Sequence, residues 1–350
     1  MIDYLIIGCG LAGIAFSEIA LQNGKTVFVM DNNSQSSSKI AGGLYNPVIL
    51  KRFSEVWKAQ EQLVFMDAFY TTVEDKIKTK VDFKKPILRK FFSVEEQSNW
   101  FAASDKKSLA PFLTTELIKK KYSGIESPYN YGEVLQTGHV DTAVLLKEYR
   151  EYLFKNGMFA ESSFEYELLE ILSDRVRYKD IEAKNIIFAE GFGMHANPYF
   201  MQLPLDGTKG ELFIIKAPEL GLDVIVNTSV FILPLGNDLF KVGATYNWKD
   251  KTDSPTEDGK LELIDRIKEI VSCDFEIVEH FAGVRPTVKD RRPLVGTHAV
   301  HFSIHVLNGL GTRGVMLGPT MAQALFDYIE KEIPLDKEID IKRFLPKGQK

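Results

Sequence analysis

The chain has 350 residues, of which 45% are hydrophobic and 26% are charged, and its net charge is −5. This length exceeds that of a usual single core, so we expect two domains or one elaborated α/β body. The acidic balance gives no general attraction for polyanions, two cysteines exclude a disulfide framework, and no Cys/His cluster predicts a metal site.

The N-terminus leads directly into an apolar strand, without the basic segment and cleavage site of a signal peptide. No apolar stretch approaches the ~18 residues needed to cross a bilayer. We therefore expect a cytoplasmic protein with no membrane contact.

Residues 3–8 and 26–31 predict two parallel strands that flank a helix from Leu11 to Asn23. The turn between the first strand and the helix reads Gly8-Cys9-Gly10-Leu11-Ala12-Gly13. In a G-x-G-x-x-G turn the first glycine allows the tight bend, the second lets the backbone approach a pyrophosphate, and the third lets the helix pack closely. The free amides and dipole of the helix N-terminus favour the phosphates.

Asp31 closes the second strand, 18 residues after Gly13. An acidic residue about 20 positions downstream accepts hydrogen bonds from a ribose hydroxyl. The strand, turn, helix and acid together predict a dinucleotide site that also includes Asn32. The alternative is a glycine-rich turn in an ordinary βαβ unit.

Further along, a serine-rich loop leads to a second glycine pair, and residues 55–78 predict a long helix. Residues 81–136 change to short strand-like pieces and lysine-rich turns, which indicates an inserted domain. Asp141 is a good N-cap for a helix that ends at Asn156, with Gly157 as its stop.

Residues 186–189 predict another apolar strand, and residues 210–280 alternate as strands of the inserted sheet. We expect a loop at 283–292, a strand at 302–307 and, after a glycine turn, a helix from Pro319 to Glu330.

Seven short motifs, from the glycine fingerprint to the segment Gly309 to Pro319, carry a resemblance to a known family. Their co-linear order resembles the D-amino acid oxidase/glycine oxidase superfamily of FAD-dependent oxidoreductases over nearly the whole chain. The five motifs between the two ends are Ala41-Gly42-Gly43-Leu44, Gly138-His139-Val140-Asp141-Thr142, Ala189-Glu190-Gly191, Gly283-Val284-Arg285-Pro286-Thr287 and Asp290 to Gly296.

Two of the motifs, 291–296 and 310–315, look most similar to one member of that superfamily. It is the oxidoreductase half of the bifunctional tRNA 5-methylaminomethyl-2-thiouridine biosynthesis protein, which removes a carboxymethyl group from a modified wobble uridine. The 350 residues do not include the methyltransferase half.

The resemblance implies an α/β plus antiparallel β fold, in which a Rossmann-type FAD-binding domain is interleaved with a mixed or antiparallel-sheet substrate domain. We expect residues 1–80, 137–204 and 281–350 in the first domain, and residues 81–136 and 205–280 in the second. It also implies one noncovalently bound FAD. Because no second fingerprint for a nicotinamide cofactor is present, the electrons would leave to oxygen or to another acceptor.

The same resemblance predicts the FAD contacts. The glycine turn 309–314 precedes a helix whose free amides would meet the flavin edge where negative charge collects on reduction. The alternative is a turn that packs close to a strand. The expected contacts are Gly8, Gly10, Leu11, Ala12, Gly13, Asp31, Asn32, Gly42, Gly43, Leu44, Glu165, Ala189, Gly191, Gly283, Arg285, Gly309, Gly311, Thr312, Arg313, Gly314 and Val315.

The expected catalytic and substrate contacts are Arg313, Arg285 and Tyr246. A guanidinium fork binds a carboxylate through two hydrogen bonds and would hold the substrate Cα–H toward the flavin. Arg285 matches the family's Gly-x-Arg-Pro motif, whereas Arg313 is shifted one place from the glycine oxidase arginine but fits the tRNA-modifying enzyme. The alternative for either arginine is an ion pair with Asp290 or a bond to a loop carbonyl. Tyr246 would be an aromatic lid or a surface-turn residue.

Five other residues have both a site and a packing interpretation. Lys209 stands where the family tends to have arginine, and Tyr45 and Asn46 follow the second glycine pair. Cys9 is expected to pack inside the fingerprint, and Cys273 has no neighbour that suggests a flavin thioether.

The implied function is oxidation of the C–N bond of an amine or amino acid by hydride transfer to flavin, without a general base. The alternatives are the wobble-uridine activity on tRNA and a non-catalytic flavin-binding protein. The pattern is neutral on the oligomeric state. Basic residues lie within 76–90 and 119–121 and at Lys342, Arg343, Lys347 and Lys350. If they surround the site, they would steer tRNA phosphates toward it. The alternative is a lysine-rich face that is only solvated.

Overall fold

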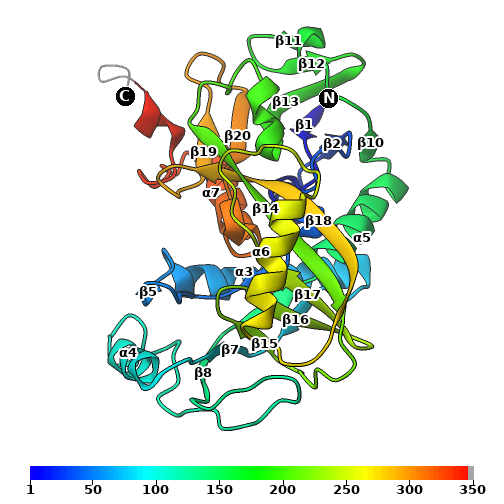
Figure 1. The fold of residues 1–350 in the computed structure, drawn as a ribbon. Coiled ribbons are helices and arrows are strands. Elements are labelled where there is room, and N and C mark those ends of the chain that lie inside the picture. Colours follow the sequence, from blue (N-terminus) through cyan, green and yellow to red (C-terminus); the bar gives the residue numbers. More distant parts are fainter. Residues whose placement is uncertain (346–350) are drawn as a thin grey trace.

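The computed structural model describes residues 1–345, so Lys347 and Lys350 lie outside the described residues. One large sheet contains β1 (Ile2–Ile7), β2 (Val27–Asp31), β10 (Phe159–Glu161), β11 (Leu169–Ile171), β12 (Val176–Tyr178), β13 (Ile181–Phe188), β19 (Leu294–Thr297) and β20 (Ile304–Asn308). Its order is β10-β2-β1-β13-β12-β11, with β20 parallel to the last residues of β13 and β19 paired with β20. Figure 1 shows this sheet in the upper part of the molecule.

Helices cover one face of this eight-stranded sheet. They are α1 (Leu11–Gln22), α5 (Thr142–Lys155) and α7 (Gly314–Lys331), while α3 (Ala59–Ile77) packs on α7 and α5, and the short α2 (Ser37–Ile40) packs on α5. α1 packs against α7, and α7 packs against α3. β1 is buried on both faces: Tyr4 and Ile6 join the cluster with the helices, whereas Leu5 and Ile7 join a second cluster on the opposite side. A parallel strand in this position needs the continuous apolar run that the sequence provides.

The second large sheet is formed by β7 (Ile87–Lys90), β8 (Tyr131–Val134), β14 (Leu205–Lys216), β15 (Ile225–Asn227), β16 (Phe231–Gly236), β17 (Leu239–Gly243) and β18 (Glu276–Val288). Its order is β18-β14-β17-β16-β15-β7-β8. The helix α6 (Glu257–Lys268) packs against β14 and β17, while α4 (Val94–Ser104) lies near β7 and β8 (Figure 1).

Smaller elements complete the fold. A three-stranded sheet joins β3 (Leu44–Tyr45), β9 (Gly138–Val140) and β6 (Asp82–Lys84), and a hairpin joins β4 (Val48–Ile49) and β5 (Ser54–Glu55). The short 3₁₀ helices are η1 (Tyr166–Leu168), η2 (Gly191–Ala196), η3 (Gly311–Arg313) and η4 (Ile341–Phe344).

The expected fold class, α/β plus antiparallel β, is confirmed. Strands of the eight-stranded sheet come from the segments 1–80, 137–204 and 281–350. Strands of the seven-stranded sheet begin in 81–136 and 205–280, although β18 runs past the expected boundary at 281 as one continuous strand. The division into two domains stays a prediction.

The expected loop at 283–292 is wrong for its first half, because residues up to Val288 belong to β18. This strand contains Pro286, although proline cannot donate to a β ladder. β18 is the edge strand of its sheet and pairs only with β14, so a residue without an N–H is tolerated there.

The last helix begins at Gly314 rather than at the expected Pro319. A proline inside a helix leaves the carbonyl four residues earlier without its usual donor. Here that carbonyl belongs to Val315, and it accepts a hydrogen bond from the buried Tyr70 hydroxyl at 2.7 Å. A tertiary contact therefore replaces the missing helical bond.

Two helices lie where the sequence indicated only strands and turns. α4 is capped by Ser93, whose hydroxyl accepts from Glu96 N at 3.2 Å, and α6 is capped by Thr256, whose hydroxyl accepts from Gly259 N at 3.1 Å. Both caps have the Ser/Thr-x-x spacing of a helix start. Neighbouring segments alternate between apolar and polar residues as strands do, so these two helix caps were overlooked.

Candidate functional site

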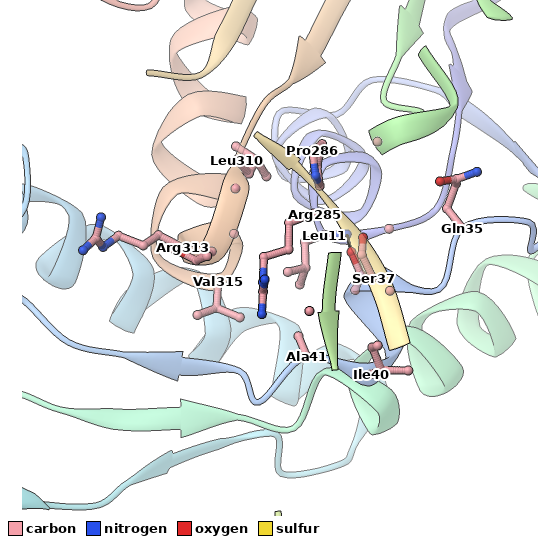
Figure 2. Close-up of a pocket in the computed structure, with 18 of the residues that line it drawn as sticks. Leu11, Gln35, Ser37, Ile40, Ala41, Arg285, Pro286, Leu310, Arg313 and Val315 are labelled. Atoms are coloured by element: carbon pink, nitrogen blue, oxygen red, sulfur yellow. Dashed lines mark hydrogen bonds between the residues drawn. The ribbon is translucent and has the colours of Figure 1, made fainter. Parts of the chain in front are cut away.

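One cavity of about 770 Å³ lies between the two large sheets. We call the part lined by Gly8, Gly10 and Asp31 the glycine end, and the part lined by Tyr246 and Arg285 the arginine end. Figure 2 shows that segments far apart in the sequence meet here. The fingerprint contributes Leu11, and the two predicted arginines come from β18 and η3.

At the glycine end the backbone is packed too tightly for side chains. Gly8 has a φ of +103°, and a Cβ there would lie 2.4 Å from the Ala189 carbonyl oxygen. A Cβ on Gly13 would lie 1.8 Å from the Gly8 carbonyl oxygen. The glycines therefore allow α1 to start directly beside β1.

The first turn of α1 faces the cavity, and within residues 1–345 no side chain accepts from its Ala12 or Gly13 amide. Gly10 is its N-cap and supplies no side-chain acceptor, while Leu11 and Ala12 line the cavity. Leu11 N donates to Ser38 Oγ at 3.3 Å. An uncapped helix start of this kind favours an anion through its N–H groups and dipole.

Asp31 lies beside this turn, held by three contacts, one of which is the bond that Asn33 N donates to its Oδ1 at 2.5 Å. Its Oδ2 accepts from Cys9 N at 2.5 Å and lies 3.3 Å from a nitrogen of Arg150, which reaches over from α5. Arg150 also donates to Asn33 Oδ1 at 2.8 Å. A carboxylate has about four acceptor positions, so Asp31 retains capacity for a ligand hydroxyl.

The second glycine pair brings another segment against the cavity. Gly43 has a φ of +66°, and a Cβ there would lie 1.9 Å from the Val140 carbonyl oxygen. A Cβ on Gly42 would lie 2.5 Å from the Phe231 ring. Both glycines therefore let this segment pass closely between β9 and β16.

The final glycine turn supplies a second uncapped helix start. Gly311 has a φ of +58°, and α7 begins at Gly314 without a side-chain cap. Gly314 and Val315 line the cavity, and a Cβ on Gly314 would lie 2.8 Å from Leu11 Cδ1. The starts of α1 and α7 therefore face the same space.

At the arginine end the Arg285 guanidinium lies against Gly210 and over the Tyr246 ring. A Cβ on Gly210 would lie 2.0 Å from an Arg285 nitrogen, and the guanidinium carbon is 4.6 Å from the Tyr246 ring centroid. Nη1 donates to Thr245 O at 3.3 Å. Within residues 1–345 no carboxylate pairs with Arg285, so its other N–H groups are available to a ligand.

Arg313 lines the same cavity, but its side chain extends away from Arg285 (Figure 2). Burial lowers the pKa of both guanidinium groups, and the Tyr246 oxygen opposes that effect. An arginine remains charged in a protein. The suggested ion pair with Asp290 does not form, because Asp290 pairs with Arg343 at 2.9 Å.

Most of the predicted site residues line this cavity, namely Gly8, Gly10, Leu11, Ala12, Asp31, Asn32, Gly42, Gly43, Leu44, Ala189, Gly191, Tyr246, Gly283, Arg285, Gly311, Thr312, Arg313, Gly314 and Val315. Gly13, Gly309 and Glu165 do not. Gly13 packs against β1, and a Cβ on Gly309 would meet Val288. The Glu165 side chain turns outward to Lys179, at 2.8 Å, between two neighbours that do line the cavity.

Among the residues with two interpretations, Asn46 lines the cavity. Lys209 is fully buried on the opposite side of β14, and the Tyr45 hydroxyl bonds inside the core. Neither cysteine lines the cavity. Burial raises the pKa of the Cys9 thiol to about 12, in keeping with a packing role.

Sequence reasoning missed three charged lining residues, Lys51, Arg150 and Glu190. Nothing in the α5 pattern distinguishes Arg150 from an exposed helical arginine. Glu190 belongs to the motif Ala189-Glu190-Gly191, but the motif predicted no role for its side chain. Its carboxyl group accepts from Tyr166 and Asn197, and burial raises its pKa.

The basic segments do not surround this cavity. No lysine of 76–90 or 119–121 lines it, and Lys76, Lys84 and Lys120 pair with acids at 2.6 to 2.8 Å. Across residues 1–345, no group of three or more His, Cys, Asp or Glu side chains could hold a metal ion. In the same range no helix is both long and apolar enough to cross a bilayer.

Two known proteins are similar to this chain in sequence. Glycine oxidase of Bacillus subtilis (strain 168) is 22% identical over 263 residues, which are 70% of this chain and 69% of that protein. The tRNA 5-methylaminomethyl-2-thiouridine biosynthesis bifunctional protein MnmC of Marinobacter nauticus is 25% identical over 167 residues, 43% of this chain but only 26% of that protein.

Solved structures share the fold. Glycine oxidase from Geobacillus kaustophilus has a TM-score of 0.77 at 18% identity and covers 99% of both chains. Iminodiacetate oxidase from Chelativorans sp. BNC1 has a TM-score of 0.79 at 18% identity and covers 96% of this chain and 98% of its own. Residues 3–328 match the family model described as DAO, FAD dependent oxidoreductase. The chain therefore belongs to the DAO family of FAD-dependent oxidoreductases.

Proposed function

We propose that the protein oxidises the C–N bond of a small amino acid or N-substituted amino acid whose carboxylate binds Arg285. The observation that carries this proposal is the Arg285 guanidinium, stacked on Tyr246 inside the cavity with no acidic partner in residues 1–345. A partly buried cation without a counter-charge is costly. An anionic substrate supplies the missing charge.

The cavity fits FAD, the cofactor of the family. At the glycine end no Cβ obstructs the turn, the start of α1 is uncapped, and Asp31 offers a carboxylate. These features suit the close approach of a pyrophosphate, its charge and a ribose hydroxyl, respectively. Gly8, Gly10, Leu11 and Asp31 would hold the adenosine diphosphate part, and the uncapped start of α7 would hold the flavin.

When bound, FAD would supply the acceptor for the hydride, with its two electrons, of the C–H bond beside the substrate nitrogen, while the C–N bond becomes C=N. The chain's own part is to hold the substrate in a productive orientation. Arg285 would bind the carboxylate through charge-assisted hydrogen bonds, which fix direction as well as position. Tyr246 is 58% exposed and stacks on that guanidinium, so it forms the outer wall that keeps solvent from the pair.

The arginine end has no evident general base. Among the described residues the lining carboxylates are Asp31 and Glu190, and both already accept hydrogen bonds from the chain. The substrate amine would therefore have to reach the site in its neutral form. We expect kcat/KM to rise with pH until the substrate amine is deprotonated.

The relatives support a small substrate. Glycine oxidase and iminodiacetate oxidase are named after small amines that carry carboxylates. Such a substrate needs a cation in the cavity and no extended contact surface. The arginine end provides that cation.

A second candidate is removal of the carboxymethyl group from a modified wobble uridine in tRNA. Arg313 in its glycine turn and the likeness to bifunctional relatives favour it. Against it, the chain spans about a quarter of those relatives, and several lysines that would attract phosphates are paired with acids. We therefore place the small amino acid first.

The test is anaerobic addition of glycine, sarcosine, iminodiacetate, D-amino acids or modified tRNA to the FAD-loaded protein. Bleaching of the flavin absorption band by a small carboxylated amine supports the proposal. Bleaching by tRNA alone supports the second candidate. If no compound bleaches the flavin, the protein is a non-catalytic flavin-binding protein and both proposals fail.

A further inference from the structure

The segment that carries Tyr246 pairs with β14 through an isolated antiparallel bridge just after the end of β17. We call residues 244–256 the Tyr246 loop. Lys209 and Asn247 exchange both backbone hydrogen bonds, at 2.8 and 2.9 Å, and Thr245 N donates to Glu211 O at 3.1 Å. The loop is therefore in register with the strand that borders the arginine end.

This register divides β14 into two sides. Gly210 and Leu212 line the cavity. Because successive residues of a strand point to opposite faces, Lys209 and Glu211 point to the other side. Tyr246, between the two paired loop residues, lies opposite Gly210 and on the cavity side as well.

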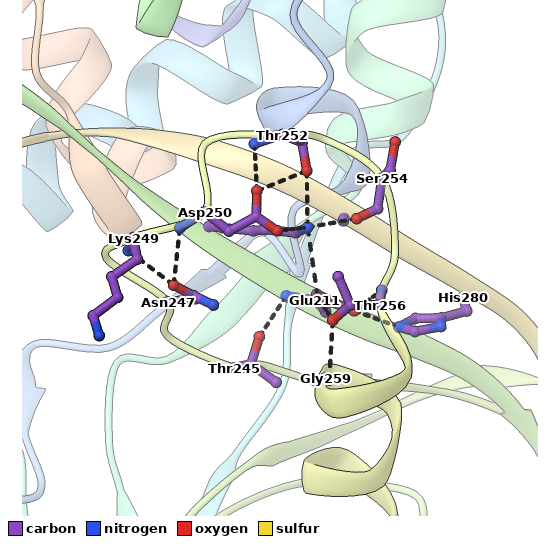
Figure 3. A network of polar contacts seen from close by, with 12 residues as sticks. Glu211, Thr245, Asn247, Lys249, Asp250, Thr252, Ser254, Thr256, Gly259 and His280 are labelled. Carbon is purple, nitrogen blue, oxygen red and sulfur yellow. Dashed lines mark hydrogen bonds and ion pairs between the residues drawn. The ribbon is translucent and has the colours of Figure 1, made fainter.

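On the outer side Lys209 binds the loop with all of its donors. Its side chain is fully buried, and Nζ donates to Asp250 Oδ2 at 2.5 Å, to Thr252 Oγ1 at 3.2 Å and to the Ser254 carbonyl (Figure 3). An ammonium group has three donors, and all three acceptors belong to the Tyr246 loop. A buried ammonium needs such partners, since burying it unpaired is costly.

Glu211 secures the far end of the same loop. Its carboxylate accepts from Thr256 N at 2.9 Å and from Thr256 Oγ1 at 2.7 Å, and His280 Nε2 lies 2.8 Å away. A Cβ on Gly259, the third residue of α6, would lie 2.4 Å from the Glu211 carboxyl carbon, so the glycine leaves room for this carboxylate. Figure 3 shows these contacts as one network on the outer side of β14.

We propose that Lys209 is a positioning residue for substrate binding, which acts through the Tyr246 loop on Arg285. The loop supplies the contacts recorded for the guanidinium beside Gly210, namely the Tyr246 ring and the Thr245 carbonyl. Release of the loop would free the guanidinium to turn away from the substrate carboxylate. The inference rests on the proposed function only in assigning that carboxylate to Arg285.

The test compares Lys209→Met, which removes the ammonium and keeps an apolar chain, with Lys209→Arg, which keeps the charge. Lys249→Met is the matched control, because Lys249 is an exposed lysine of the same loop that joins the network only through its backbone N, which the substitution leaves in place. Five quantities are measured on each FAD-loaded protein: hydrogen exchange of residues 244–256, FAD affinity after reconstitution, the dissociation constant of acetate, and KM and kcat for the substrate found above.

In Lys209→Met we expect faster exchange confined to residues 244–256, and KM and the acetate dissociation constant raised by about tenfold, as misplacement of a binding group predicts. kcat and FAD affinity should stay unchanged. Lys209→Arg should restore much of the acetate affinity, and Lys249→Met should behave as the unaltered protein. If Lys209→Met does not fold, Asp250→Asn removes the same ion pair from the loop side and should raise KM in the same way.

A released loop with unchanged KM and acetate affinity would overturn the inference and leave Lys209 a purely structural residue. A parallel fall in kcat, FAD affinity and acetate affinity would also overturn it, because that pattern reports general damage. Failure of the proposed function is recognised separately. In that case no amine bleaches the flavin, while exchange and acetate binding still decide whether Lys209 positions Arg285.

Discussion

The glycine end of the cavity is formed mainly by closely packed backbone, whereas the arginine end is formed mainly by side chains. Gly8, Gly10 and Gly13 lie within six consecutive residues, and the closest obstacles at Gly8 and Gly13 are backbone carbonyls. The arginine end combines side chains from β14, β18 and the Tyr246 loop, and the obstacle at Gly210 is the end of the Arg285 side chain. A backbone cannot yield as a side chain can. The first end should therefore fail by losing structure, and the second by losing substrate.

The largest effect is expected for Gly13→Ala. The new Cβ would lie 1.8 Å from the Gly8 carbonyl oxygen, so α1 must move away from β1. Overpacking against a backbone group predicts a loss of about 3 kcal/mol in unfolding free energy, together with loss of bound FAD. Urea unfolding and the flavin content of the purified protein measure both.

Gly318→Ala is the control for that variant. Gly318 also lies in a helix that packs on α1, but its nearest neighbour would be 3.6 Å from the new Cβ. An alanine in a helix with room for it is expected to stabilise by about 0.5–1 kcal/mol. Equal stability of the two variants would contradict the tight contact between α1 and β1.

Arg285→Gln should produce the opposite kind of failure. Removing the charged anchor is expected to lower kcat/KM about 100-fold, equivalent to about 2.7 kcal/mol. Unfolding free energy and FAD affinity should stay close to their original values, because no acid is left unpaired. Arg285→Lys keeps the charge but not the planar fork, so it should recover only part of the loss. An unchanged KM for a carboxylated amine would remove Arg285 from the substrate site.

The pH dependence of the unfolding free energy tests the eight-stranded sheet behind the glycine end, independently of the cavity. His305 in β20 is buried between Thr297 Oγ1 at 2.7 Å and Asn185 Oδ1 at 3.0 Å, and burial lowers its pKa from 6.5 to about 3. Below pH 6.5 the unfolded chain binds a proton that folded His305 does not bind. Stability therefore falls as the pH drops from 6.5 toward 3, by about 2 kcal/mol at pH 5.

Urea unfolding of the original protein and of His305→Asn at pH 7 and pH 5 measures this contribution. The variant should lose less stability between the two pH values, whatever its stability at pH 7. An identical pH dependence of the two proteins would mean that His305 is protonated in the fold.

The smallest effect is expected for Gly210→Ala, which sharpens the contrast with Gly13→Ala. Its Cβ would lie 2.0 Å from an Arg285 nitrogen, so the guanidinium must swing aside while the backbone stays in place. KM should rise about tenfold through the displaced anchor, with little change in melting temperature. A large loss of stability would show that the arginine end is as rigid as the glycine end.

The features that could be predicted from the sequence were those determined by residues close to one another in the chain. The fingerprint and Asp31 determine a strand, a turn and a helix start whose contacts lie nearby in the chain, and the structure places most of them on the cavity. The cap at Asp141 and the stop at Gly157 were likewise local, and α5 has these ends.

The features that escaped prediction depend on distant partners. The pairing of Lys209 with Asp250 exists only because the Tyr246 loop folds back on β14. The helical start of α7 before Pro319 depends on a hydroxyl from α3. Arg150 reaches Asp31 only through the packing of α5. No local pattern encodes such contacts, because each partner alone resembles an ordinary surface or core residue.

The alternation along β14 has a practical consequence for altering the substrate range of this enzyme. Since Lys209 and Glu211 hold the Tyr246 loop while Gly210 and Leu212 of the same strand line the cavity, a mutation that widens the cavity at Leu212 risks disturbing the opposite face as well. The segments 46–51 and 227–230 also border the cavity and take no part in the contacts by which Lys209 and Glu211 hold the Tyr246 loop. Libraries intended to accept larger amines should begin there.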